Sequence, residues 1–108
     1  MVELKSDKLI IRKKSSIDII HLPKVLFIER FNHKTYLNLF DGKQIIINSS
    51  LKELEQILPQ NFKKTHRSFI INIEHLEGLN IFNEKTYEAS FPNEKYALVS
   101  KSCIDKLL

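Results

Sequence analysis

The sequence predicts a mainly β fold, and three observations favour it. Short runs rich in isoleucine, leucine and phenylalanine recur along the chain and are separated by turn-forming residues. Only one segment, at about residues 50–58, has the pattern of an α-helix. The chain has 108 residues, 43% of them hydrophobic, which is enough to bury the core of one domain. We therefore expect residues 1–108 to form a single domain, with a loose N-terminal segment at residues 1–7.

The first part of the chain is expected to contain three strands. Residues 8–13 and 16–22 are rich in isoleucine and are separated by basic and serine residues that suit a turn. Pro23 then interrupts the pattern. Residues 25–29 follow as a third strand, and they are apolar enough to be buried on both faces.

A hairpin is the best local prediction. Residues 36–40 and 43–48 flank Asp41-Gly42, a pair that suits a two-residue type I′ turn. Pairing across that turn predicts one cross-strand pair on each face, Leu37 with Ile46 and Tyr36 with Ile47. Since both faces carry apolar residues, we expect the hairpin to be covered on two sides.

One helix is expected between the strands. Ser50 and Glu53 have the spacing of a capping box, and Pro59 marks the end of the element. Leu51, Leu54 and Leu58 fall on one stripe that can pack against a core. Further strands are expected at residues 69–73, 79–82, 86–91 and 95–99, and a short helical turn at 102–108 closes the chain.

Composition favours a polyanionic partner. Seventeen Lys and Arg residues against thirteen Asp and Glu give a formal charge of +4 and a pI near 9.2. The single cysteine, Cys103, excludes an internal disulfide and a multi-cysteine zinc site. No apolar run approaches the roughly 20 residues that span a bilayer, so a cytoplasmic location is expected.

No catalytic pattern is found. The four histidines, His21, His33, His66 and His75, lack the spacing of a zinc site. There is no glycine-rich phosphate loop and no GxSxG nucleophile motif, and Cys103 is best explained as a small core residue. We therefore expect no enzymatic activity, no metal and no cofactor.

A basic segment at residues 62–73 is the main candidate for binding. Its cations directly precede an apolar strand, so they could form a short basic loop at the end of that strand. Lys64 suits phosphate oxygens, Arg67 can form a two-pronged contact with guanine, and Ser68 can donate to a phosphate. The alternative is a solvated basic turn. For His66 and Asn72 a structural role, hydrogen-bonding nearby backbone, is the better interpretation.

The sequence resembles the LytTR family of DNA-binding domains. Residues 63–73 are similar to its central pattern of basic residue, His, Arg, Ser, aromatic, two aliphatics and Asn. Residues 25–29 resemble its I-x-Y-I-E strand, residues 50–55 its S-L-K-E-L-E helix, and residues 97–101 its I-P-V-S-R segment. Each motif is weak alone, but the four occur in the family's order over residues 8–108.

The resemblance implies an elongated fold of several small antiparallel β-sheets that inserts loops into successive major grooves. It also implies a bacterial transcription regulator, such as the output domain of a response regulator, that binds promoter repeats as paired monomers. A receiver domain or a regulatory membrane protein would lie outside this chain. The implied base contacts come from His33 or Lys34, Arg67 and Lys101, and the phosphate contacts from Lys64, Ser68, Ser100 and Ser102.

Two departures from the family pattern and two rival functions stay open. Lys101 stands where the family usually has arginine, which predicts looser base discrimination because lysine lacks the planar fork. Glu94, in the turn before that motif, would bring an acidic group close to DNA. His33 and Lys101 could also be ordinary solvated residues. The rival functions are a protein-interaction module with a basic loop and a single-stranded nucleic-acid binder.

Overall fold

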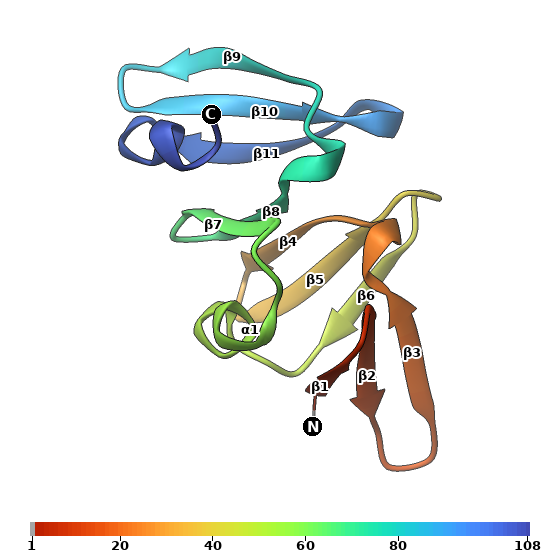
Figure 1. Cartoon of the computed structure of the whole chain (residues 1–108). Coiled ribbons are helices and arrows are strands. Elements are labelled where there is room, and N and C mark those ends of the chain that lie inside the picture. Colours follow the sequence, from red (N-terminus) through yellow and green to blue (C-terminus); the bar gives the residue numbers. More distant parts are fainter. Residues whose placement is uncertain (1) are drawn as a thin grey trace.

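The computed structural model describes residues 2–108, which form three antiparallel sheets, one α-helix and four short 3-10 turns. The sheets follow one another along the molecule, whose principal extents are 45 × 25 × 24 Å (Figure 1). The predicted mainly β, elongated fold is therefore confirmed. Across residues 2–108, no helix has both the length and the apolar character needed to cross a membrane.

The N-terminal sheet has the order β1-β2-β3, with β1 (Val2–Lys5), β2 (Lys8–Arg12) and β3 (Ile17–His21). The prediction of a loose segment at residues 1–7 is wrong, because Val2–Lys5 pairs with β2 along its whole length. Val2 and Leu4 pack against the first core. The connecting turn has Ser6 at φ 58° and contains neither glycine nor asparagine, so the sequence carries no hairpin signature there.

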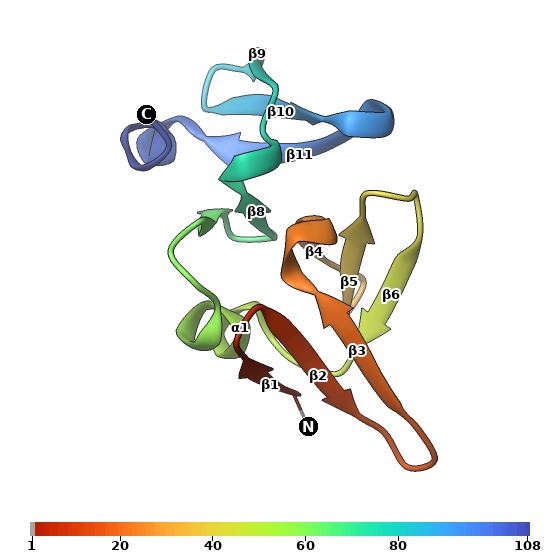
Figure 2. The same cartoon turned by 45° about the vertical axis from the view of Figure 1, so that its right-hand side comes forward.

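The central sheet has five strands in the order β6-β5-β4-β8-β7. Their bounds are β4 (Val25–Phe31), β5 (Lys34–Leu39), β6 (Gln44–Ile47), β7 (Phe62–His66) and β8 (Phe69–Asn72). The N-terminal sheet and the helix cover one face, and the C-terminal sheet lies beyond the other face (Figures 1 and 2). Strand β4 is buried on both faces as expected, since Val25, Leu26, Phe27 and Ile28 are at most 3% exposed.

The backbone bond between Leu39 and Lys43 closes a loop of three residues, 40–42, between β5 and β6, rather than the predicted loop of two. The Gly42 N–H donates to the Leu39 carbonyl at 3.0 Å, and the Leu39 N–H donates to the Lys43 carbonyl at 2.9 Å. Gly42 has φ 89°, a left-handed conformation that suits glycine at the end of a three-residue hairpin loop. The prediction that Gly42 lies in the turn is correct, but Gly42 is the third residue of a three-residue loop and not the second of two.

This loop shifts the hairpin register by one residue. Leu37 lies opposite Ile45, and Tyr36 lies opposite Ile46, so both predicted pairs are wrong. The expectation that both faces are covered is also wrong for β6, because Ile46 is 49% exposed. The C-terminal sheet packs mainly against β4, β7 and β8, and the side chain of Ile46 on the edge strand β6 stays exposed.

The helix α1 (Leu51–Ile57) has the predicted capping box. Ser50 Oγ accepts the Glu53 N–H at 3.1 Å, and Glu53 Oε1 accepts the Ser50 N–H at 2.9 Å. The Ser50 N–H, and after it the Ser50 hydroxyl, favour the charged carboxylate and lower the pKa of Glu53. Leu51 and Leu54 are buried in the first core, and Leu58 caps the helix at its C-terminus.

The C-terminal sheet has the order β11-β10-β9, with β9 (Gly78–Asn83), β10 (Thr86–Phe91) and β11 (Lys95–Ser100). A second core joins it to the central sheet and contains Leu26, Phe27, Phe69, Ile71, Ala89, Phe91, Ala97 and Val99. The remaining elements are the 3-10 turns η1 (Leu22–Lys24), η2 (Ile73–His75), η3 (Pro92–Glu94) and η4 (Lys101–Lys106). The predicted helical turn at 102–108 corresponds to η4, which begins one residue earlier.

Side-chain bonds to the backbone fasten the C-terminal sheet to the central sheet. The His75 ring is hydrogen-bonded to the Pro23 carbonyl, and the Asn93 amide donates to the Phe40 carbonyl. At the other end of the interface, Thr65 Oγ1 donates to the Leu98 carbonyl at 3.1 Å. Bonds at both ends restrict rotation of one sheet against the other.

Candidate nucleic-acid interface

The β4–β5 turn presents His33 to solvent. Asn32 and His33 have φ values of 52° and 65°, which is the backbone of a type I′ turn. Behind the turn, Arg30 Nη1 donates to Thr35 Oγ1 at 2.8 Å, and that hydroxyl donates to the Ser49 carbonyl at 2.6 Å. Lys34, the first residue of β5, is exposed beside the turn. The hairpin is therefore tied to the segment before α1, with its imidazole at the tip.

The β7–β8 turn presents Arg67 in the same way. The Ser68 N–H donates to His66 Nδ1 at 3.1 Å, and the His66 ring meets Phe69 edge-on at 5.8 Å between centroids. Arg67 is exposed, whereas Ser68 is half-buried. The structural role expected for His66 is thus present, since its ring closes the turn that carries Arg67.

The lysines of the basic segment do not lie in a loop. Lys63 and Lys64 belong to β7, where they lie opposite Ile71 and Ile70, and both are half-buried. The predicted short basic loop is therefore limited to the turn at Arg67. Lys63 and Lys64, which precede this turn, lie on β7. This strand forms one edge of the central sheet and pairs only with β8 among the described strands.

The third candidate patch lies where β11 ends. The Lys101 N–H donates to the Lys85 carbonyl at 2.9 Å, and the Lys101 ammonium lies 5.4 Å from the centroid of the Tyr87 ring. Ser100 is half-buried and Ser102 is exposed beside a shallow hollow that Lys85 also lines. Lys85, in the β9–β10 turn, is a cation of this patch that the sequence analysis missed.

The structure brings the three patches together along one edge. The Arg30 N–H donates to the Ser68 carbonyl at 2.8 Å, which joins the first two turns, and the Thr65–Leu98 bond joins β7 to β11. In Figure 1 this edge runs down the left side, from the β9–β10 turn and η4, past the β7–β8 turn, to the β4–β5 turn. None of its cations forms an ion pair with a carboxylate of residues 2–108.

Glu94 does not lie on this edge. It belongs to η3, before β11, whereas Lys101 follows the other end of that strand. Six residues of extended chain lie between them, so that their Cα atoms are roughly 23 Å apart along the strand. Glu94 is therefore distant from the Lys101 patch, and the expectation that it brings an acidic group close to DNA stays a prediction.

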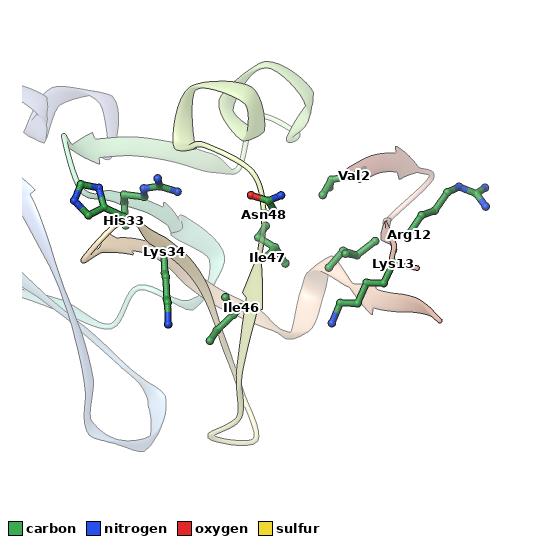
Figure 3. A pocket seen from close by; sticks show the side chains of 10 residues that line it. Val2, Arg12, Lys13, His33, Lys34, Ile46, Ile47 and Asn48 are labelled. Atoms are coloured by element: carbon green, nitrogen blue, oxygen red, sulfur yellow. The ribbon is translucent and has the colours of Figure 1, made fainter. Parts of the chain in front are cut away.

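A hollow of ≈ 390 Å³ lies between the N-terminal sheet and the β4–β5 hairpin. His33 and Lys34 border it on one side and Arg12 and Lys13 on the other, with the end of β6 between them (Figure 3). The two cations of the N-terminal sheet already contact carboxylates, Arg12 with Glu3 at 3.0 Å and Lys13 with Asp18 at 2.9 Å. Their partners reduce the positive potential of this hollow relative to the turns at His33 and Arg67.

Acidification is expected to weaken the β7–β8 turn. Burial of the ring, and then the neighbouring Arg67 charge, lower the pKa of His66 below its ordinary value of 6.5. Nδ1 can accept the Ser68 N–H only when it carries no proton. Because the folded chain binds fewer protons than the unfolded chain, this contribution is present above pH 6.5 and is lost as pH falls towards the folded-state pKa.

Two measurements check this prediction. An NMR titration should give His66 a pKa below 6.5, and urea denaturation should show stability falling below that pH. His66→Gln is the control, because its amide oxygen can still accept the Ser68 N–H and does not titrate. If the glutamine variant shows the same loss of stability on acidification, His66 is not its source.

Comparisons with known proteins show the family and the fold of the chain. Residues 15–108 match the family model for the LytTr DNA-binding domain. The structure is similar to the LytTr DNA-binding domain of a Bacillus cereus regulator, with a TM-score of 0.77 and 26% identity, covering 94% of this chain and 93% of that one. The sequence is 25% identical over 100 residues to the transcriptional regulatory protein NatR of Bacillus subtilis (strain 168).

The NatR match covers 91% of this chain and 42% of NatR, so the chain spans less than half the length of that relative. The family match, in contrast, extends over most of the present chain and includes all three exposed basic turns. The resemblance of the four sequence motifs to LytTR is thus confirmed. This chain belongs to the LytTR family of DNA-binding domains.

Proposed function

We propose that the chain is the DNA-reading part of a bacterial transcription regulator that acts in the cytoplasm. The observation that carries the proposal is the alignment of three exposed basic patches on one edge, with the turns of His33 and Arg67 joined by the Arg30–Ser68 bond. Successive major grooves on one side of B-DNA are roughly 34–36 Å apart. A molecule 45 Å long is long enough to reach from one groove into the next.

Within this proposal one set of exposed side chains contacts bases and a second set, close to the first, contacts phosphates. Arg67 would make a two-pronged contact with guanine, and His33 or Lys34 would read the neighbouring groove position. Lys64, Ser68, Ser100 and Ser102 would bind phosphate oxygens and so set the register. Two such domains would occupy adjacent promoter repeats as paired monomers, under the control of a receiver domain or a regulatory membrane protein.

Lys101 would take part with its side chain supported by Tyr87. The ring lies 5.4 Å from the ammonium, a cation–π contact that orients the lysine without neutralising its charge. A lysine held in this way can donate to a base or to a phosphate, but it cannot form the planar contact of an arginine. We therefore propose that the patch around Lys101 contributes affinity more than base discrimination.

Replacing Arg67 with alanine is expected to weaken binding to the preferred duplex by about 1–3 kcal/mol and to relax the preference at one base pair. The physical reason is that the planar fork recognises two acceptors of one base, which no phosphate contact can replace. The measurement is selection of binding sites from a random duplex pool, followed by titrations of the wild type and the variant on the selected site.

Lys64→Ala is the matched control. A lost phosphate contact should weaken all duplexes about equally and lower the slope of log affinity against log salt by about one. Competition with single strands and with protein ligands separates the rival functions. The proposal is wrong if Arg67→Ala leaves affinity and sequence preference unchanged, or if the wild type prefers single strands to duplex.

A further inference from the structure

Phe31 is an exposed aromatic residue on the edge that carries the basic turns. It is the last residue of β4, directly before the Asn32–His33 turn, and its side chain is 63% exposed. The preceding residue, Arg30, donates its N–H to Ser68 in the β7–β8 turn. Phe31 therefore lies between the turn that carries His33 and the turn that carries Arg67.

The fold does not account for this ring. Four of the seven phenylalanines pack inside the fold, each at most 7% exposed, namely Phe27, Phe62, Phe69 and Phe91, whereas Phe31 is the most exposed of the other three, with Phe40 at 50% and Phe82 at 56%. Phe31 belongs to neither core, and among residues 2–108 no aromatic ring lies in contact with it. Covering an exposed apolar ring removes it from water, so a ligand that covers Phe31 binds with a more favourable free energy.

The thymine methyl group is the apolar feature that the major groove offers. Of the four base edges in that groove, only that of thymine ends in a C5-methyl, and phenylalanine is among the side chains that contact it. The other groups displayed there are hydrogen-bond donors and acceptors, which a phenyl ring cannot satisfy. A ring between two base-reading turns is thus suited to distinguish thymine from cytosine.

We propose that Phe31 is a specificity-determining residue that packs its ring against the C5-methyl of a thymine between the bases reached by His33 and Arg67. The inference rests on the proposed function, because it requires the edge to face the major groove. It adds an apolar contact to a surface whose other contacts are polar, and it makes one position of the site depend on a methyl group.

Replacing single thymines of the selected site by deoxyuridine tests the proposal, because that change removes only the methyl. The wild type should lose roughly three- to tenfold in affinity at one or two thymines and nothing at the others. Phe31→Ala should bind the unmodified site more weakly by a similar factor. It should also lose no further affinity at those same thymines, since the partner of the methyl is gone.

Two further variants serve as controls. Phe40→Ala removes an exposed ring, 50% accessible, from the other end of β5, and it should keep the wild-type response to deoxyuridine. Phe31→Leu keeps an apolar side chain and should retain part of the methyl dependence. Because Phe31 is exposed, both Phe31 variants should unfold at urea concentrations close to that of the wild type.

The outcomes separate this inference from the proposed function. If Phe31→Ala weakens binding but responds to deoxyuridine like the wild type, the ring does not contact a methyl and the inference is wrong. If Phe31→Ala changes nothing while Arg67→Ala still relaxes the preference, the inference fails and the proposed function stands. If the wild type selects no duplex sequence, both fail together.

Discussion

Replacing Leu54 with aspartate is expected to unfold the domain. Leu54 is fully buried on α1, in the core that joins the helix, the N-terminal sheet and the central sheet. Truncating such a leucine costs about 2–5 kcal/mol, and a carboxylate left there without a partner adds a further penalty. The total stability of a domain is about 5–15 kcal/mol, so the two costs together remove most or all of it.

Circular dichroism and urea denaturation of purified protein check this prediction. The variant should lose its cooperative transition, whereas Lys52→Asp, an exposed position of the same helix, should stay within about 0.5 kcal/mol of the wild type. The control also places a negative charge in the first turn of a helix, where the helix dipole favours it. A Leu54→Asp variant with a wild-type midpoint would show that α1 does not anchor the core.

The same helix shows what a sequence can predict. Its cap depends on Ser50 and Glu53, three residues apart, and its stripe depends on leucines within two turns. Every contact that defines the element lies within a few residues, so the local pattern was sufficient. Strand β10 was likewise predicted with its observed bounds, because residues 86–91 lie between two clear turns.

Elements whose definition depends on distant partners were missed or misplaced. Strand β1 is short and follows a turn without glycine, and β2 alone identifies it as a strand. Strand β7 cannot be recognised from the sequence alone, because Lys63 and Lys64 obscure its alternation and its pairing with β8 depends on the fold. The β5–β6 register was wrong because Asp41-Gly42 suits both a two-residue and a three-residue loop.

The candidate site also has a part that the sequence predicts and a part that only the fold provides. The motifs supplied the identities of His33, Arg67 and Lys101, but they did not show what holds the three together. That depends on a backbone bond between residues 30 and 68 and on a side-chain bond between residues 65 and 98. The sequence does not single out Phe31, because a phenylalanine next to an apolar strand has the same local pattern whether it lies in the core or in solvent.

Asn72 is expected to give the second large loss of stability. Its side chain is 1% exposed at the end of β8. Nδ2 donates to the Val25 carbonyl at 3.0 Å, and Oδ1 accepts from Asn61 Nδ2 at 2.9 Å and from the Glu74 N–H at 3.1 Å. One amide thus joins the start of β4, the segment before β7 and the turn η2. The structural role predicted for this residue is confirmed.

Asn72→Leu should therefore cost about 3 kcal/mol or more. It removes three hydrogen bonds at nearly constant volume, and each polar group left buried without a partner costs about 1–3 kcal/mol. Asn72→Asp tests the donor alone, because it keeps the accepting oxygen but replaces the donating Nδ2 with a second oxygen. That oxygen would face the Val25 carbonyl and repel it, so this variant should be comparably destabilising. Asn61→Ala, which removes a single partner, should cost about 0.5–1.5 kcal/mol.

Urea denaturation measures these differences, and DNA binding of the fraction that stays folded distinguishes stability from recognition. Asn72 ends β8, whereas the turn of Arg67 and Ser68 precedes the start of that strand. The folded fraction of each variant should thus keep wild-type affinity, in contrast to Arg67→Ala, which should fold normally and bind weakly. An Asn72→Leu variant as stable as the wild type would mean that apolar packing, not the amide, holds the start of β4 against β8.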